Sequence, residues 1–487
     1  MSVAAIVKYG HFIDGAFVAP SGGAYFDSID PATGQATSSY ARGNASDVDN
    51  AVQAAKKGLK AWRAFTPYER ARCLLRIAGL LRDNTERIAL SETLESGHPI
   101  SRTRKDVENS ARYFDYYAGI ADKILGEVIP TTDAHLTYTS REPYGVTAQI
   151  TPWNAPLHQL ARGVAPSLAA GNSIIAKPAE QTSGSALILA ELACRAGLPA
   201  GALNIVTGFG HEVGLPLVDH PAVRQITFTG SVDTGRLILT RAAQRVVPVT
   251  TELGGKSPFI VFADADLDAA VKAVVPALLT LSGQTCSAGT RLLVERSVLP
   301  DFLERMVALI KNSITIGPGM DDRVMGPLVS QKQMERVLSL IETGLQEGAR
   351  LVHGGKRLTE GALACGYFVE PTIFSDVDNS MRIAREEIFG PVGVVIPFDT
   401  AAQAADIAND SDFGLVAAIW SRDFPKAHRL AAQLECGQVF INNYRGVGME
   451  APFGGYKLSG HGREKGLEAM RYYMQVKTII VNVSGPA

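Results

Sequence analysis

The chain has 487 residues, of which 46% are hydrophobic and 20% are charged. This composition supplies enough apolar side chains for several cores, so it excludes a disordered chain and predicts about three domains. The 47 basic and 49 acidic residues give a net charge of −2, which leaves no excess of positive charge for a polyanion. We therefore do not expect nucleic acid as a partner.

The cysteines and the apolar stretches predict a compartment. The five cysteines, Cys73, Cys194, Cys286, Cys365 and Cys436, are far apart and odd in number, which is typical of a reducing environment. The longest apolar stretches, such as residues 271–281, are interrupted and too short to cross a bilayer. The N-terminal residues lack the basic region and long apolar run of a targeting peptide. We expect a cytoplasmic protein that does not bind a membrane.

The first 120 residues are expected to be mainly helical. Apolar side chains at helical spacing predict a helix from Asp47, with Ser46 as its N-cap. Thr66 and Pro67 have the order of a cap and a first helical residue, and they predict a second helix that runs through Leu81.

From Gly145 onward, short β-rich runs alternate with helical segments. The expected strands of a first unit are residues 145–150, 173–176, 203–206, 225–228 and 258–262, and a helix is expected at 183–196. A second set at 291–295, 392–398, 417–420 and 438–442 continues the alternation. Alternation of this kind is typical of doubly wound parallel sheets, so we expect an α/β protein with two such units. Ligands of these folds lie at the carboxyl ends of the strands.

Cys286 is a candidate nucleophile. It lies in the run SGQTCSAGT, where glycines and small hydroxyl residues leave the sulfur uncrowded. A thiolate there would attack a carbonyl carbon if amide dipoles or a base activated it. A buried packing residue is the alternative for any lone cysteine, and the local run alone does not decide between them.

Two polar residues at expected strand ends are candidates for acid–base chemistry. Glu252, in the run TELGGKSP, follows a β-rich run, and partial desolvation there would raise its pKa towards that of a general base. Asn154, in TPWNAP, lies on the loop after residues 145–150, and its amide could donate to an oxyanion. A surface glutamate and a turn-forming asparagine are the alternatives.

Two further runs are candidates for a nucleotide. Lys177 and Glu180 directly follow an expected strand, where a carboxylate can accept both hydroxyls of an NAD ribose, although a solvated surface pair is as compatible. The run GSVDTG, residues 230–235, precedes a helix and suits a phosphate. It lacks the spacing GxGxxG, so by itself it is a weak signal.

Seven runs occur in one order along the chain: PWN, KPAE, FTGS, ELGGKSP, GQTC, EEIFGP and PFGGYKLSG. Together they resemble the NAD(P)-dependent aldehyde dehydrogenase superfamily, from about Phe12 to Val481. The resemblance implies a variant Rossmann cofactor domain, a second α/β catalytic domain and a small β excursion for oligomerisation. The implied bounds are 1–125 and 144–253 for the NAD-binding domain, 254–455 for the catalytic domain, and 126–143 and 474–487 for the oligomerisation segments of a homodimer or homotetramer.

The same resemblance implies roles for individual residues. Cys286 is expected to be the nucleophile, Glu252 the general base, and Asn154 with the Cys286 amide the oxyanion hole. No metal ligand is expected, and the other four cysteines are expected to be packing residues. The residues implied to bind NAD are Ile150, Thr151, Pro152, Trp153, Lys177, Glu180, Gly210, Gly230, Ser231, Gly235, Leu253, Glu387 and Phe389.

The expected reaction is oxidation of a small-molecule aldehyde to its carboxylic acid through a thiohemiacetal and a thioester. Arg162 matches the position at which succinate semialdehyde dehydrogenases carry a carboxylate-binding arginine, and Arg445 and Phe453 are further candidate substrate residues. An aldehyde with an acidic far end is therefore one expected substrate, and a neutral aliphatic or aromatic aldehyde is the alternative. A surface Arg162 paired with a glutamate is the other interpretation of that residue.

Two other roles are compatible with this fold. A catalytically silent protein is one, but such a protein has no chemical reason to retain Cys286, Glu252 and Asn154 together. An acylating enzyme that passes the thioester to coenzyme A is the other, and Glu252 favours water as the acceptor instead.

Overall fold

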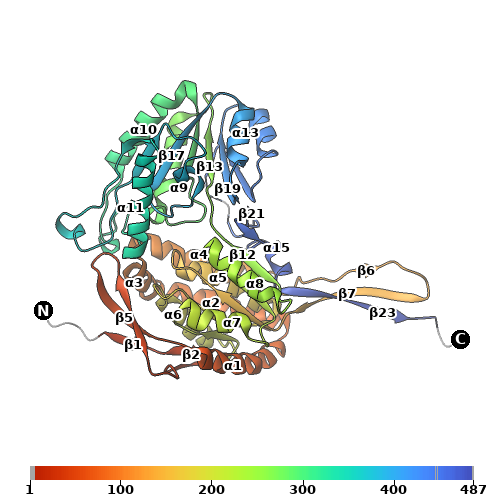
Figure 1. Ribbon diagram of the computed structural model, residues 1–487. Helices are drawn as coiled ribbons and strands as arrows, with labels where there is room; N and C mark the ends of the chain where they lie inside the picture. Colours follow the sequence, from red (N-terminus) through yellow and green to blue (C-terminus); the bar gives the residue numbers. More distant parts are fainter. Residues whose placement is uncertain (1–5, 445, 447, 485–487) are drawn as a thin grey trace.

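The computed structural model describes residues 6–444, 446 and 448–484. These residues form two lobes and a projecting arm, as Figure 1 shows. The lower lobe is built on an eight-stranded sheet, the upper lobe on a seven-stranded sheet, and the arm on a three-stranded sheet. The expected doubly wound parallel sheets are both present. The expectation that residues 258–262 form a strand of the first unit is wrong, because residues 258–261 pair with strands of the upper lobe's sheet.

The sheet of the lower lobe has the strand order β22-β12-β11-β8-β9-β10-β2-β3, and its five central strands are parallel. Helices cover both of its faces, so its central strands at 146–150 and 225–229 are buried at every position rather than at alternate ones. The parallel strands are β8 (Val146–Ile150), β9 (Ser173–Lys177), β10 (Leu203–Ile205), β11 (Gln225–Thr229) and β12 (Val249–Glu252). The antiparallel edge strands are β2 (His11–Ile13), β3 (Ala16–Val18) and β22 (Gly460–His461).

The helices of the lower lobe come largely from the first half of the chain. They are α1 (Ala45–Arg63), α2 (Pro67–Asp83), α3 (Thr85–Ser96), α4 (Ile100–Ala118), α5 (Pro156–Ala170), α6 (Gly184–Arg195), α7 (Leu215–Asp219) and α8 (Val232–Ala243). The predicted cap at Thr66 is confirmed, because its side chain accepts a hydrogen bond from the backbone N–H of Glu69. The predicted cap at Ser46 is wrong, because Asn44 accepts from the amides of Ser46 and Asp47.

The expectation that the first 120 residues are mainly helical is wrong for residues 7–41. This segment holds β2 and β3 together with β1 (Val7–Tyr9), β4 (Tyr25–Asp30) and β5 (Gln35–Ala41). These strands are short, and most of the residues of β1, β3 and β4 are exposed or half-buried, so they lack the continuous burial of the central strands.

The sheet of the upper lobe has the order β15-β16-β17-β14-β13-β19-β20, with β15 as its antiparallel edge. Its strands are β13 (Pro258–Val261), β14 (Arg291–Glu295), β15 (Arg350–His353), β16 (Thr372–Ser375), β17 (Val392–Phe398), β19 (Val416–Trp420) and β20 (Gln438–Ile441). Its helices are α9 (Leu267–Leu279), α10 (Leu299–Ser313), α11 (Gln331–Gln346), α12 (Arg382–Arg385), α13 (Ala401–Asn409) and α14 (Phe424–Ala431).

The arm joins two segments that are far apart in the chain. It consists of β6 (Val128–Ile129), β7 (His135–Pro143) and β23 (Met474–Asn482), and β23 runs antiparallel to β7 along its whole length. A short pair, β18 (Phe413–Gly414) with β21 (Tyr456–Lys457), and α15 (Glu468–Arg471) lie on the path back from the upper lobe. Because β22 returns to β12, the lower lobe's sheet includes residues beyond 253. The assignment of the lobes and arm to cofactor binding, catalysis and oligomerisation stays a prediction.

Candidate active site

The carboxyl ends of the lower lobe's central strands meet at one edge. Ile150 at the end of β8 is paired with Lys177 of β9, and Thr229 at the end of β11 is paired with Glu252 of β12. The loops that follow β8, β11 and β12 line a cavity of about 340 Å³ together with Cys286 of the upper lobe. A second cavity, of about 520 Å³, also has Cys286 in its wall. The sulfur-bearing residue thus belongs to both cavities.

Cys286 lies on the loop between α9 and β14. Burial raises the pKa of its thiol to about 11, the cations of Arg162 and Lys465 oppose that rise, and the carboxyl groups of Glu387 and Glu252 add to it. The thiol is therefore protonated at neutral pH and needs a base before it can act as a nucleophile.

Asn154 lies on the loop between β8 and α5, with its side chain buried. Its Nδ2 donates a hydrogen bond of 2.9 Å to the carbonyl oxygen of Gln284, two residues before Cys286. Because a carbonyl oxygen only accepts, this bond fixes the orientation of the amide and leaves its second N–H for a ligand. The amide also lines both cavities beside Cys286, where an oxyanion would form.

Glu252 is the last residue of β12 and is 1% exposed. Neither of its carboxyl oxygens has a hydrogen-bond partner among the described residues. Burial raises its pKa well above the usual range, the nearby carboxyl of Glu464 adds to the rise, and the charge of Arg162 opposes it. A methyl group on Gly454 would lie 2.8 Å from Oε1, so the glycine of the run PFGGYK lets this carboxyl lie against the backbone.

The residues expected to bind NAD divide into two sets. Pro152, Trp153, Gly230, Ser231, Leu253, Glu387 and Phe389 line the 340 Å³ cavity. Ile150, Thr151, Lys177, Glu180, Gly210 and Gly235 do not line it. Lys177 and Glu180 lie at the carboxyl end of β9, with Nζ and the carboxylate 3.7 Å apart. Gly235 has a packing role, because a methyl group there would lie 2.7 Å from Leu253 Cδ2.

The chemistry of this cavity fits a dinucleotide. Ser231 caps the N-terminus of the twelve-residue helix α8, which offers amide donors to a phosphate. The Glu387 carboxylate accepts from the Gly255 amide at 3.0 Å, and burial raises its pKa to about 7. The rings of Trp153 and Phe389 meet edge to face at 5.3 Å. Phosphate donors, hydroxyl acceptors and an aromatic wall are thus present together.

Two of the three residues expected to bind the substrate lie in the second cavity. Arg162 and Phe453 line the 520 Å³ cavity. Arg162 is buried and forms an ion pair with Glu464, and its Nη2 donates to Thr229 Oγ1 at 3.4 Å. The interpretation of Arg162 as a surface residue is therefore wrong, while its pairing with a glutamate is confirmed. Arg445 lies outside the described residues.

Sequence reasoning missed Lys465, which lines this cavity, and Glu464, the partner of Arg162 behind it. The backbones of Phe453 and Glu464 exchange two hydrogen bonds of 2.7 Å, and this pairing brings the run REKG beside Arg162. The signal was present as adjacent opposite charges within the glycine-rich run HGREKG.

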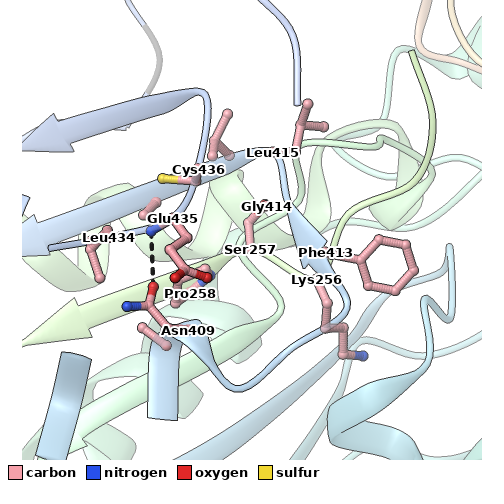
Figure 2. A pocket seen from close by; sticks show the side chains of 13 residues that line it. Lys256, Ser257, Pro258, Asn409, Phe413, Gly414, Leu415, Leu434, Glu435 and Cys436 are labelled. Carbon is pink, nitrogen blue, oxygen red and sulfur yellow. Dashed lines mark hydrogen bonds between the residues drawn. The ribbon is translucent and has the colours of Figure 1, made fainter. Parts of the chain in front are cut away.

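A separate cavity near Cys436 and Lys256 is too small for a substrate. Its volume is about 10 Å³, room for about one water molecule. Figure 2 shows its walls, where the backbone N–H of Glu435 donates to Asn409 Oδ1 at 2.9 Å. Among the cysteines expected to pack, Cys73 is buried, but Cys365 is exposed, so that expectation is wrong for Cys365.

Known proteins resemble this chain over nearly its whole length. A sequence model of the Aldehyde dehydrogenase family matches residues 17–479. Hydroxyisobutyraldehyde dehydrogenase of Mycolicibacterium austroafricanum is 45% identical over 473 residues, which are 97% of this chain and 93% of that protein. The NAD+ complex of aldehyde dehydrogenase from Bacillus cereus has a TM-score of 0.95 and 41% identity, and the match covers 98% of this chain and 97% of that one.

A variant of P. syringae AldA, an indole-3-acetaldehyde dehydrogenase in complex with NAD+ and IAA, also has a TM-score of 0.95 at 41% identity. That match covers 97% of this chain and 96% of the other. The chain therefore belongs to the aldehyde dehydrogenase family. The predicted family, fold class and class of reaction are confirmed. Within the described residues, no helix has the length and apolar composition needed to cross a membrane.

Proposed function

We propose that the protein oxidises an aldehyde to the carboxylic acid with NAD as cofactor, and that Cys286, Glu252 and Asn154 carry the reaction. The observation that carries this proposal is the convergence of three groups from two lobes on one cavity. The Asn154 amide and the buried Glu252 carboxyl come from the ends of β8 and β12, and the Cys286 sulfur comes from the upper lobe. Nucleophile, base and oxyanion donor are the set that acyl chemistry requires.

Each group has one task. The thiol of Cys286 gives its proton to water, and the thiolate sulfur adds to the aldehyde carbon. The oxyanion of the resulting thiohemiacetal accepts a hydrogen bond from the free N–H of Asn154 Nδ2. NAD, when bound, supplies the hydride acceptor that turns this adduct into a thioester. Glu252 then removes a proton from water, the resulting hydroxide attacks the thioester, and the carboxylic acid leaves while the thiolate of Cys286 is restored.

The residues that would hold NAD are those of the 340 Å³ cavity and of the carboxyl end of β9. We propose that the start of α8, at Gly230 and Ser231, faces the phosphates, that Glu387 and Phe389 lie by the nicotinamide ribose and ring, and that Lys177 and Glu180 hold the other ribose. The position of these residues at the ends of parallel strands supports this assignment.

The test is NADH formation from a panel of aldehydes by wild type and by Cys286→Ala, with and without coenzyme A. We expect turnover by the wild type that does not need coenzyme A, and less than a few per cent of it in the variant, which should melt at the same temperature. Substantial turnover by Cys286→Ala would refute the assignment of the nucleophile. Turnover that required coenzyme A would identify an acylating enzyme instead.

A small hydroxylated aldehyde is a second candidate for the substrate. The M. austroafricanum relative, at 45% identity, is named for hydroxyisobutyraldehyde. The same aldehyde panel should include it, and the ratio of kcat/KM between hydroxylated and plain aldehydes of equal length measures this preference.

We also propose that the protein is a cytoplasmic homodimer or homotetramer assembled through the arm. Strand β23 leaves large apolar side chains exposed, with Val476 at 57% and Ile480 at 64%. Exposed apolar side chains on a sheet that projects from the body are typical of an interface between subunits. Sedimentation of the wild type and of a Val476→Glu/Ile480→Glu variant tests this, since a monomeric wild type would contradict it.

A further inference from the structure

We propose that Lys465 is the residue that selects the substrate, and that it receives a carboxylate at the far end of an aldehyde acid. This inference rests on the proposed oxidation at Cys286 and adds the chemical class of the substrate. It differs from the expectation for Arg162, whose charge the structure shows to be used elsewhere.

The cations of the 520 Å³ cavity differ in what they already bind. Arg162 is paired with Glu464, Arg102 donates to Asp106 at 2.9 Å, and Arg112 lies 3.6 Å from Glu450. Lys105 is exposed at the rim. Among the described residues of this cavity, Lys465 is the one partly buried cation whose nitrogen has neither a hydrogen bond nor an ion pair.

Lys465 shares a cavity with the reacting sulfur. It lines the same cavity as Cys286, its charge opposes the rise in the pKa of that thiol, and its Nζ is 5.1 Å from the centre of the Phe453 ring. A cation in the wall of the cavity that holds the nucleophile can pair with an anionic group at the other end of a bound aldehyde. The structure therefore favours a substrate that carries a carboxylate.

The backbone of Lys465 is in an unfavourable conformation. Its φ of 61° is left-handed, which costs a residue with a Cβ roughly 1 kcal/mol or more. Residues held in this way cluster at functional sites because the surrounding structure fixes them. Here the antiparallel pairing of Phe453 with Glu464 sets the chain just before Lys465.

The charged groups around Lys465 leave its positive charge without a negative partner. Arg162 and Glu464 cancel each other, and burial raises the pKa of Glu252, which favours its neutral form. Burial and the charge of Arg162 lower the pKa of Lys465 to about 8. The groups that oppose this fall are Glu464, Cys286 and Glu252. The charge of Lys465 in turn helps to lower the pKa of His158. A bound carboxylate would supply the missing negative charge.

The first experiment compares aldehydes that differ only in the terminal group. The probes are 3-oxopropanoate, 4-oxobutanoate and 5-oxopentanoate, each against the neutral aldehyde of equal chain length, and the readout is the ratio of kcat/KM, acid over neutral. We expect the wild type to favour the acid for at least one length, and Lys465→Met to lower that ratio about tenfold or more. Lys465→Arg should keep it within about threefold, because the charge remains.

Two matched variants separate binding at Lys465 from general attraction of anions. Lys332→Met removes an equal charge from the exposed surface of α11, and Lys105→Met removes the cation at the rim. If Lys105→Met or Lys332→Met lowers the ratio as much as Lys465→Met, attraction is diffuse and the proposal is wrong. Lys465→Asn, which tolerates the left-handed backbone, is the second variant should Lys465→Met fold poorly.

The pH dependence of the acid-over-neutral ratio of kcat/KM is an independent test. The ratio of kcat/KM should fall as pH rises through about 8 in the wild type, because the free lysine loses its charge there, and it should be flat in Lys465→Met. Titration of Cys286 and Glu252 affects both aldehydes of a pair and cancels in the ratio. A wild-type ratio that does not change with pH would overturn the proposal.

A second experiment needs no turnover. Iodoacetate is negatively charged, iodoacetamide is neutral, and both alkylate cysteine. The ratio of their alkylation rates at Cys286 therefore reports the local electrostatic potential, and the exposed Cys365 is the internal reference. Lys465→Met should lower the ratio at Cys286 and leave it unchanged at Cys365. An unchanged ratio at Cys286 would refute the role of Lys465, whereas the absence of NADH from every aldehyde would refute the proposed oxidation.

Discussion

The imidazole Nε2 of His98 donates a hydrogen bond of 3.0 Å to the main-chain carbonyl of Asn154. Since the carbonyl only accepts, the proton lies on Nε2 and the ring is neutral, and burial lowers the pKa of His98 to about 4. Two residues after Asn154, helix α5 begins, and Oε1 of buried Glu92 accepts from the Leu157 amide at 2.6 Å. Glu92 of α3 and His98 just after this helix thus hold the loop that carries Asn154.

The first prediction concerns His98. Replacing it by Ala leaves a buried carbonyl without a donor, so we expect a loss of about 1–3 kcal/mol in the free energy of unfolding and a lower kcat for all aldehydes alike. His98→Gln should restore much of both, because its Nε2 can donate from a similar position. Urea unfolding and steady-state kinetics measure the two effects, and equal behaviour of the Ala and Gln variants would contradict the positioning role.

The same residue predicts a change of stability with pH. Its pKa is lower in the folded protein than the usual 6.5, so the unfolded chain binds more protons between about 4 and 6.5. The free energy of unfolding should therefore fall as pH drops through this range. His98→Gln should show a shallower acid limb than the wild type.

The second prediction concerns the buried pair of Arg162 and Glu464. Removing one partner leaves an uncompensated buried charge, so Arg162→Met and Glu464→Gln should each cost about 3–5 kcal/mol in the free energy of unfolding. The double variant should cost clearly less than the sum, and an additive result would show that the two groups do not interact. In Arg162→Met the rise of kcat/KM with pH should move to higher pH, because a cation that stabilises the Cys286 thiolate is gone.

How much of this architecture the sequence could predict depends on the kind of strand. The central strands β8, β9 and β11 are short β-rich runs, buried at every position, that alternate with helical segments, so their positions followed from residue order. Strand β2 has three residues and pairs with β10, which lies about 190 residues further along the chain, and no local pattern encodes such a partner. The helical expectation for the N-terminal segment failed for that reason.

The site divides in the same way. Cys286, Glu252 and Asn154 stand in runs whose order along the chain pointed to them. The surroundings of Arg162 did not follow from the sequence, because its partner Glu464 reaches it only through the backbone pairing with Phe453. Lys465 follows Glu464 directly, so the same pairing sets its place in the cavity.

The third prediction separates acylation from hydrolysis. Glu252→Gln should still form the thioester and release a first equivalent of NADH, and then turn over slowly, because water lacks its base. Stopped-flow absorbance shows the burst, and Glu304→Gln on the exposed face of α10 is a control that should behave as the wild type. Equal losses in the burst and in the steady state would assign the base to another group.

The fourth prediction is that NAD is preferred over NADP, and it depends on Glu180. Its carboxylate, 3.7 Å from Lys177 Nζ, can accept hydrogen bonds from ribose hydroxyls, whereas a 2′-phosphate beside it would meet like charge. Lys177 offers this phosphate little compensation, because its Nζ donates to the Pro178 carbonyl at 2.7 Å and already neighbours Glu180. We expect kcat/KM to favour NAD by about tenfold or more, which is the effect of one like-charge contact of about 1.4 kcal/mol. Glu180→Gln should narrow the preference mainly by improving NADP, while Lys177→Met should weaken both cofactors. A wild type that favours NADP, or a Glu180→Gln variant with the same preference as the wild type, would show that Glu180 does not select the cofactor.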